Sequence, residues 1–280
     1  MKKYIEIIFF VLIIFVGCED KDVDPEFSEV PSSFTKKVLI EEFTGAWCGY
    51  CPVGALIVDD LMAENDNIIG VAAHVDDAMS IEQSYFLETT YQSSSYPSGM
   101  VDRTPYDGVV SLNAGYWSYF ANNQLSMTSM CGLAMRSKVS GNNATVEVHA
   151  GFNSELDGDY RVTVYLIEDD VTGSGYGYDQ VNYYDSESES PFYGLGNPIV
   201  GYEHNNTLRA VLSEPLGDPL DNSVLIAGGE HVEVYTADIS SFNKKNLHAV
   251  AFIHNVGSTF TEHEVLNVQK VSVNGFQDWD

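Results

Sequence analysis

Residues 38–52 decide the fold and read Val38-Leu39-Ile40-Glu41-Glu42-Phe43-Thr44-Gly45-Ala46-Trp47-Cys48-Gly49-Tyr50-Cys51-Pro52. The first six, residues 38–43, are mostly apolar and partly β-branched, which predicts a buried strand that ends at Gly45. From Cys51 onward, apolar residues recur at steps of three and four, which is the spacing of a helix. The stretch therefore predicts a strand, a turn that carries two cysteines, and a helix.

Cys48 and Cys51 form a Cys-x-x-Cys pair within a sequence that holds four cysteines. Such a pair can be half of a zinc site, a structural clip or a redox-active dithiol. A zinc site needs four ligands, and no second pair or His-x₃-His follows at a suitable spacing. A structural clip would close a loop too short to stabilise much. The pattern therefore favours a redox dithiol, and Cys131 is interpreted as a buried, inert thiol.

The expected positions of the two sulfurs suit different steps of thiol–disulfide exchange. Cys48 is expected at the N-terminus of the helix, where unpaired N–H groups and the helix dipole stabilise a thiolate. Cys51 is expected one turn further, shielded and able to resolve a mixed disulfide.

The motif Trp47-Cys48-Gly49-Tyr50-Cys51 resembles the W-C-G-x-C active site of the thioredoxin superfamily. The resemblance implies a thioredoxin-like α/β domain over residues 37–129. It also implies that Trp47, Tyr50 and Tyr96 bind substrate, with the Tyr96 backbone presented to an extended peptide.

The same resemblance implies roles for two further residues. Glu42 lies six residues before Cys48, where the superfamily carries a buried acid that accepts the proton of the resolving thiol. Pro97 is the candidate for the cis-proline beside the dithiol. Glu41 is expected on the opposite, solvent-exposed face of the strand. Where the superfamily often has a lysine, this sequence offers His74, which is either structural or an alternative proton relay.

Three further elements are predicted before residue 129. Residues 67–75 are apolar and predict a second buried strand. Residues 79–91 predict a helix, with Tyr85 and Phe86 among the residues that face inward. Residues 112–127 predict an amphipathic helix that closes the domain.

The second half, residues 130–280, changes to short alternating segments separated by Gly, Asn and Asp turns. This texture predicts an antiparallel β-sandwich of immunoglobulin-like type, without helices. The predicted strands are residues 144–150, 160–167, 208–212, 231–235, 247–254 and 265–273.

A long segment, residues 173–201, interrupts the predicted strands and contains six aromatic residues between Tyr176 and Tyr193. Loops of this length are usually functional or disordered, and tyrosine-rich loops often form binding surfaces. Two interpretations stay open: a loop that binds a surface ligand, and a flexible acidic loop with a few packed aromatic side chains.

The first residues predict export. Residues 1–17 form a signal with a basic start and an apolar run too short to span a bilayer, and they precede Cys18, the predicted lipidation site. Residues 18–36, acidic and containing prolines, predict an extended tether. An ordinary secretory signal followed by an incidental cysteine is the alternative. A net charge of -28, from 13 basic and 41 acidic residues, makes nucleic acid an unsuitable partner.

Three motifs together resemble the Omp28-related lipoproteins of Bacteroidetes-type bacteria. They are residues 41–52, the stretch Tyr96-Pro97-Ser98-Gly99-Met100, and the stretch Tyr202-Glu203-His204-Asn205-Asn206-Thr207-Leu208-Arg209. The resemblance spans nearly the whole chain. It implies a lipid-anchored protein of the cell envelope, at the outer membrane and on its periplasmic or surface face.

The leading functional hypothesis is a thiol–disulfide oxidoreductase or isomerase that acts on envelope or surface proteins. It needs no cofactor and no metal, and its partners are protein thiols and disulfides and, through Cys18, the membrane. The alternative is a non-enzymatic adhesin or receptor that uses the β-sandwich and the loop of residues 173–201. A calcium-dependent module is a third hypothesis, prompted by the acidity alone.

Overall fold

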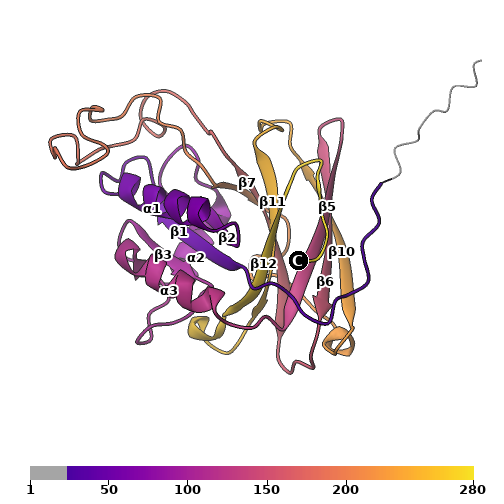
Figure 1. Ribbon diagram of the computed structural model, residues 1–280. Coiled ribbons are helices and arrows are strands. Elements are labelled where there is room, and N and C mark those ends of the chain that lie inside the picture. The colour runs from indigo at the N-terminus through magenta and orange to yellow at the C-terminus, as the bar shows by residue number, and fades with distance from the viewer. Residues whose placement is uncertain (1–23) are drawn as a thin grey trace, which may run out of the picture.

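Thirteen strands and three α-helices form the part of the protein that the computed structural model describes, residues 24–280 (Figure 1). The strands are β1 Val38–Thr44, β2 Ile68–His74, β3 Ser98–Val101, β4 Leu112–Asn113, β5 Cys131–Ser140, β6 Asn143–Phe152, β7 Tyr160–Glu168, β8 Thr207–Val211, β9 Asp218–Pro219, β10 Glu230–Asp238, β11 Leu247–Asn255, β12 Val265–Ser272 and β13 Phe276–Gln277. The helices are α1 Cys51–Glu64, α2 Glu82–Thr90 and α3 Trp117–Leu125, with 3-10 turns η1 Ala114–Tyr116, η2 Asn222–Val224 and η3 Phe260–Glu262. The predicted signal, residues 1–17, and Cys18 lie outside the described residues.

Two sheets organise these elements into a mixed α/β fold. The larger has nine strands in the order β12-β11-β7-β8-β2-β1-β3-β4, with β9 paired to β7. Within it β1 and β2 are parallel, and β3 runs antiparallel to β1. The smaller sheet has four strands in the order β10-β6-β5-β13. Because β8 pairs with both β2 and β7, one sheet runs through both halves of the chain. The expected division of domains at residue 129 stays a prediction.

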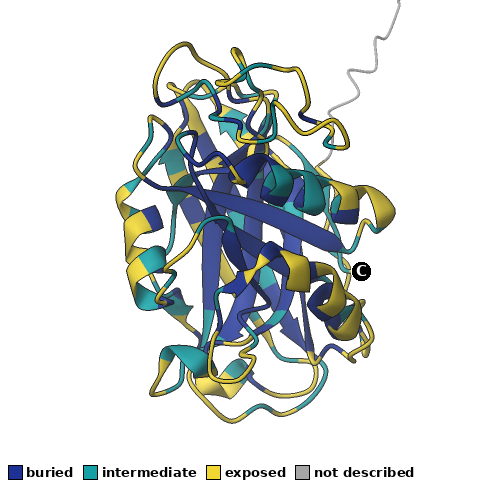
Figure 2. Ribbon diagram, turned by 90° about the vertical axis from the view of Figure 1, so that its left-hand side faces the viewer, coloured by how far each residue is buried: buried dark blue, intermediate teal, exposed yellow. Residues whose placement is uncertain are grey.

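The two faces of the large sheet are covered differently. On one face, α1 and α3 pack on β1 through a cluster that includes Val38, Ile40 and Trp117. Further along the same sheet, β7 and β11 pack on the smaller sheet through a second cluster. The opposite face carries a third cluster, which runs from Leu39 under α2 to Phe252 in β11. Figure 2 shows the strands as almost uniformly buried behind the helices.

The predicted elements of the first half form, with differences at their ends. Strands β1 and β2 are completely buried, as their apolar sequences predict. Helix α2 begins at Glu82, and Tyr85 and Phe86 face solvent, so the prediction that these two rings point inward was wrong; Ser84 and Leu87 are buried instead. Within residues 24–280, no helix combines the length and the apolar character needed to cross a membrane.

Glu41 is a second correction, because its side chain is 2% exposed although it was expected in solvent. Its carboxylate accepts hydrogen bonds from Arg103 Nε at 2.7 Å and Nη2 at 2.8 Å. The Tyr165 hydroxyl of β7 lies 3.1 Å from the same carboxylate. Strand β1 therefore has no exposed face, and the face away from Glu42 holds a buried ion pair.

The described part of the predicted tether, residues 24–36, lies along the all-β half. Phe27 packs under the Arg136 guanidinium, 4.7 Å from the ring centroid, and the Ser28 N–H donates to the Asp278 carboxylate at 3.1 Å. This segment is therefore bound to the folded body before β1 begins.

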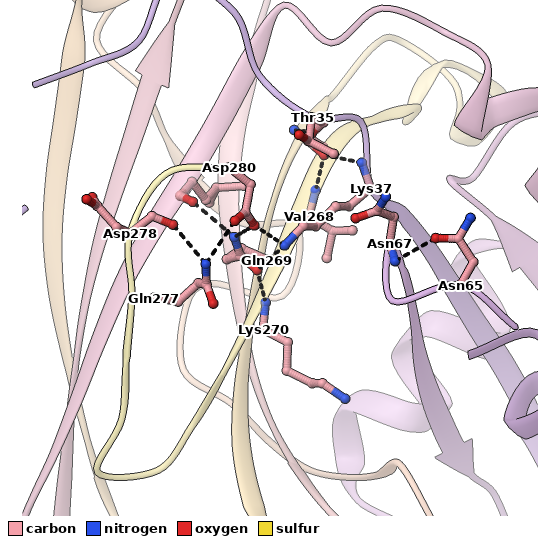
Figure 3. A network of polar contacts seen from close by, with 12 residues as sticks. Thr35, Lys37, Asn65, Asn67, Val268, Gln269, Lys270, Gln277, Asp278 and Asp280 are labelled. Carbon is pink, nitrogen blue, oxygen red and sulfur yellow. Dashed lines mark hydrogen bonds and ion pairs between the residues drawn. The ribbon is translucent and has the colours of Figure 1, made fainter. Parts of the chain in front are cut away.

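Polar contacts join the start of β1 to the last strands, as Figure 3 shows. Lys37 Nζ donates to the Gln269 amide oxygen at 2.8 Å, and the Gln269 amide donates to the Asp280 carboxylate at 2.8 Å. Gln277 donates to the same carboxylate at 3.0 Å. These side chains line an open groove of about 720 Å³ that contains no residue of the cysteine motif.

Candidate functional site

The cysteine pair lies where β1 gives way to α1. Cys48 and Cys51 form a disulfide, with their Cα atoms 5.4 Å apart. Cys51 is the first residue of α1 and Pro52 follows it, where a missing N–H costs the helix no hydrogen bond. Cys48 lies in the preceding turn, whose backbone is closed by the Cys51 N–H donating to the Cys48 carbonyl at 3.1 Å. The strand–turn–helix arrangement is as predicted, but Cys51 begins the helix instead of lying one turn inside it, and Cys48 precedes the helix by three residues.

Glu42 and Pro97 meet at the first turns of α1, next to Cys51. Gly54 faces both: a Cβ on Gly54 would clash with the Glu42 carboxylate and lie 2.8 Å from Pro97 Cβ. Glycine in a helix interior costs about 1 kcal/mol relative to alanine, so this close approach accounts for its presence. The Tyr96–Pro97 peptide bond is cis.

Glu42 has the environment of a proton-holding group. Its side chain is 2% exposed, and among residues 24–280 no protein group hydrogen-bonds its Oε1 atom. Burial, and secondarily the nearby Asp59 carboxylate, raise the pKa of Glu42 well above its ordinary value of 4.5. The protonated form therefore persists at a pH where a solvated glutamate is ionised.

Trp47, Tyr50 and Tyr96, the predicted substrate-binding residues, are held in different ways. The Trp47 ring contacts the Tyr96 ring edge-on at 5.1 Å, and its Nε1 donates to the Val75 carbonyl at 2.7 Å. The Tyr96 hydroxyl bonds to Glu88. Tyr50 is 53% exposed, and its ring packs against Tyr183 and Tyr184. Trp47 and Tyr96 thus form one contiguous surface beside Pro97.

The tyrosine-rich loop (residues 173–201) lies over the cysteine motif, at the top left of Figure 1. The Gln180 side-chain amide donates to the Cys48 carbonyl at 2.9 Å. The Val181 N–H donates to the Ala46 carbonyl at 2.7 Å, and the Tyr183 N–H donates to the Gly49 carbonyl at 3.0 Å. Cys48 is consequently only 4% exposed. The length and tyrosine content of the loop identified it in the sequence as a candidate functional segment. No sequence pattern indicated that it packs on the cysteine turn.

Aromatic side chains complete this cover. Tyr183 and Tyr184 pack edge-on against Tyr50, with ring centroids 5.1 and 5.8 Å away. A Cβ on Gly49 would collide with the Tyr183 ring, so glycine is needed for the loop to lie this close. Internal hydrogen bonds from the Asn182 side chain hold the loop together.

His74 and Cys131 take structural positions. His74 Nδ1 pairs with the Asp77 carboxylate at 2.6 Å, and its ring contacts the His204 ring edge-on at 5.0 Å. Cys131 is fully buried between the sheets, where desolvation raises the pKa of its thiol to about 12. Cys131 is therefore an unreactive thiol, as predicted.

Within residues 24–280, no group of three or more His, Cys, Asp or Glu side chains is placed to hold a metal ion. The groups that the structure brings together here are the two sulfurs, the buried carboxyl of Glu42 and the surface that Trp47 and Tyr96 share. Sulfur–sulfur exchange coupled to a proton transfer is what these groups can perform.

Comparison with known proteins adds a family and a fold. The family model of "Outer membrane protein Omp28" matches residues 84–277. HBP35 of Porphyromonas gingivalis superposes with a TM-score of 0.67 at 21% identity, over 86% of this chain and 76% of that one. A crystal structure of a domain of the outer membrane lipoprotein Omp28 from Porphyromonas gingivalis covers 54% of this chain and 100% of that one, at 16% identity and a TM-score of 0.32. No curated protein matches the chain.

The family match extends over more than half of the chain and includes two of the three motifs recognised in the sequence, at residues 96–100 and 202–209, but not the cysteine motif at residues 41–52. The predicted location at the outer membrane of the cell envelope is thereby confirmed. The chain belongs to the Omp28 family of outer membrane proteins.

Proposed function

We propose that the protein is a thiol–disulfide oxidoreductase or isomerase of the cell envelope, acting on disulfides of envelope or surface proteins. The observation that carries this proposal is the Cys48–Cys51 disulfide at the start of α1, with Glu42 and Pro97 against the same turns of that helix. The same arrangement supports a thioredoxin-like assignment for residues 37–129. The packing of β7 and β11 of the larger sheet on the smaller sheet supports an immunoglobulin-like sandwich for residues 130–280.

The proposed reaction exchanges sulfur partners in two steps. The Cys48 thiolate attacks a substrate disulfide, forms a mixed disulfide and releases one substrate thiolate. Cys51 then gives its proton to ionised Glu42 and attacks the Cys48 sulfur, which closes the protein disulfide and releases the second substrate thiolate. Two electrons pass from the protein to the substrate, and the reverse sequence oxidises a substrate dithiol. Electrons move between sulfur atoms alone, so the proposal includes no cofactor and no metal.

The surface formed by Trp47 and Tyr96 supports binding of an extended peptide, since it lies beside Pro97 and is lined by aromatic rings. Tyr50 packs against Tyr183 of the tyrosine-rich loop. A substrate therefore approaches between the Tyr96–Pro97 bond and this loop. In the proposal, lipid chains on Cys18 hold the protein at the membrane, where its disulfide-bonded protein substrates are found.

The test compares the wild type with Cys48→Ser in two assays, insulin reduction and refolding of a substrate with scrambled disulfides. The wild type is expected to accelerate both, and the variant neither. Equal rates for the two proteins would refute the proposal. A Cys51→Ala variant expressed in cells is expected to retain mixed disulfides with its substrates, which a reducing gel then releases for identification.

A surface-binding function is the second candidate, and exposed side chains on the tyrosine-rich loop favour it. Tyr176 is 88% exposed, Val200 77% and Tyr193 54%. Because the loop contacts the cysteine turn, deleting residues 173–201 would disturb both functions, and point substitutions separate them better. If the loop binds a surface ligand, Tyr176→Ser with Tyr193→Ser abolishes adhesion to that ligand and leaves insulin reduction at the wild-type rate.

A further inference from the structure

We propose that Asp59 carries the proton of the resolving step from buried Glu42 to solvent. The Tyr202–Asn206 segment forms one side of this route. This inference rests on the proposed function and extends it, because that reaction leaves a proton on a carboxyl with no direct contact to water. Asp59 lies on α1, two turns beyond Cys51.

Two small cavities connect the carboxyls of Glu42 and Asp59. The first, of about 20 Å³, is lined by Glu42, Cys51, Asp59 and Tyr202, among others. The second, of about 10 Å³, again has Glu42 and Asp59 in its wall. A water molecule needs about 10–15 Å³ and two to four polar partners, so the first cavity has room for a bridging water. The unpartnered Oε1 atom of Glu42 is a buried polar group that such a water would satisfy.

Asp59 has one side toward this cavity and one toward solvent. It is half-buried, and it accepts hydrogen bonds from Asn206 Nδ2 at 3.3 Å and, more weakly, from Asn205 Nδ2 at 3.5 Å. Asn205 is exposed, whereas Asn206 is 5% exposed and its carbonyl accepts from the Ala72 N–H of β2 at 2.8 Å. The carboxylate is therefore fixed at the cavity mouth by a segment far away in the sequence.

The Tyr202–Asn206 segment belongs to a motif that the dithiol chemistry alone leaves without a role. Its placement here explains the residue types. Asn205 and Asn206 donate to Asp59, and His204 Nε2 donates to the Tyr178 carbonyl at 2.8 Å, which ties the segment to the tyrosine-rich loop. Burial lowers the pKa of His204 to about 4, so this histidine stays neutral at neutral pH.

The ionisable groups that face Glu42 come from three elements. Helix α1 supplies Cys51 and Asp59, and β2 supplies His74. The Tyr202–Asn206 segment supplies Tyr202, Glu203 and His204. His74 is paired with Asp77, and Glu203 is exposed. Of the carboxylates in the described part of the chain, Glu42 and Asp59 are the two that line both cavities.

The proposed route moves one proton from Cys51 to solvent. Cys51 Sγ–H gives its proton to the Glu42 carboxylate, and the resulting thiolate closes the disulfide. Glu42 passes the proton through the bridging water to the Asp59 carboxylate, which releases it to solvent. Glu42 is thereby returned to its ionised form for the next resolving step.

The test uses Asp59→Asn in the full-length protein, with Asp60→Asn as its matched control, because Asp60 is the next residue of the same helix and is exposed. A mixed disulfide is formed on Cys48 with a coloured thiol, and its release by Cys51 is followed in a single turnover across the pH range. Asp59→Asn is expected to slow release at least about tenfold and to move its pH midpoint. Asp60→Asn and the first attack by Cys48 are expected to keep wild-type rates.

An infrared titration gives a readout that does not depend on turnover. The carbonyl stretch of protonated Glu42, identified by its loss in Glu42→Gln, is expected to titrate at lower pH in Asp59→Asn, since a neighbouring negative charge is removed. If the wild type releases thiol no faster than a protein without Cys51, the proposed function and the relay both fall. If the wild type is active and Asp59→Asn matches Asp60→Asn, the relay alone is refuted.

Discussion

Glu41 and Glu42 are neighbours in β1, and both are buried, yet their carboxyls meet opposite environments. Glu42 faces α1 with an oxygen that no protein group in the described residues hydrogen-bonds, while Glu41 binds Arg103 through two hydrogen bonds. Burial without a cation raises the pKa of the Glu42 carboxyl, so that it holds its proton to a higher pH than a solvated glutamate. The Glu41 carboxylate instead accepts two charge-assisted hydrogen bonds from one guanidinium. Two adjacent glutamates therefore differ in their partners: Glu42 has the environment that the proposed proton transfer needs, and Glu41 belongs to a buried ion pair.

At this scale, Glu42→Gln is expected to stabilise the oxidised protein increasingly as the pH rises. The folded wild type keeps the Glu42 proton above pH 4.5, where the unfolded chain loses it. The stability from the protonated form is complete below about that pH and is lost as pH rises toward the folded-state pKa. The free energy of unfolding of the variant should rise relative to that of the wild type by roughly 1.4 kcal/mol per pH unit over this range. Urea unfolding at several pH values measures the difference in unfolding free energy between Glu42→Gln and the wild type. The control is Glu64→Gln, at an exposed position, whose difference should not change with pH. A Glu42→Gln difference that is equally independent of pH would contradict the prediction.

At the scale of elements, the tyrosine-rich loop and the cysteine turn form one unit. Three hydrogen bonds and the Tyr50–Tyr183 contact fasten the loop to the turn, and they leave Cys48 almost without exposure. A protein disulfide under such a cover reacts only with partners that displace the loop or enter beside it. The loop therefore limits which thiols reach the sulfur.

Tyr183→Ala tests this cover. Loss of the ring removes its packing on Gly49 and Tyr50, so the disulfide is expected to be reduced several-fold faster by dithiothreitol in stopped-flow measurements. The matched control is Tyr176→Ala, since Tyr176 lies in the same loop but is 88% exposed. Equal reduction rates for the two variants would show that the loop does not limit access.

At the scale of the whole molecule, a buried cation joins the two halves of the chain. Arg103 follows β3 and is fully buried between Glu41 of β1 and Tyr165 of β7. Its guanidinium also lies 4.8 Å from the Phe252 ring centroid in β11. Together with the continuous sheet, this contact predicts that the halves unfold together.

Arg103→Gln is expected to lower the free energy of unfolding by about 3–5 kcal/mol, because it leaves the Glu41 charge buried without its partner. Arg161→Gln is the control: its partner Asp159 is partly exposed, so the cost should stay below about 1 kcal/mol. Calorimetry should show one transition in the wild type. Two transitions, or equal costs for the two variants, would contradict the account.

The sequence predicted features that depend on nearby residues and missed those that depend on distant ones. The strand–turn–helix around Cys48 follows from local periodicity, and most strands of the second half follow from alternation. Gln180 bonds to Cys48 across 132 residues, and Glu41 meets Tyr165 across 124. No local pattern encodes such pairings. Asp59 was missed for the same reason, since its asparagine partners lie far along the chain.

The central claim is that Cys48 and Cys51 form a redox couple rather than a structural clip. Equilibration with glutathione buffers, followed by alkylation and mass analysis of the cysteine pair, measures its reduction potential. The account predicts a reversible two-electron transition between about -270 and -120 mV, the range from thioredoxin to the strongly oxidising periplasmic enzymes. A disulfide that resists reduction to below about -300 mV, as structural disulfides of secreted proteins do, would contradict it.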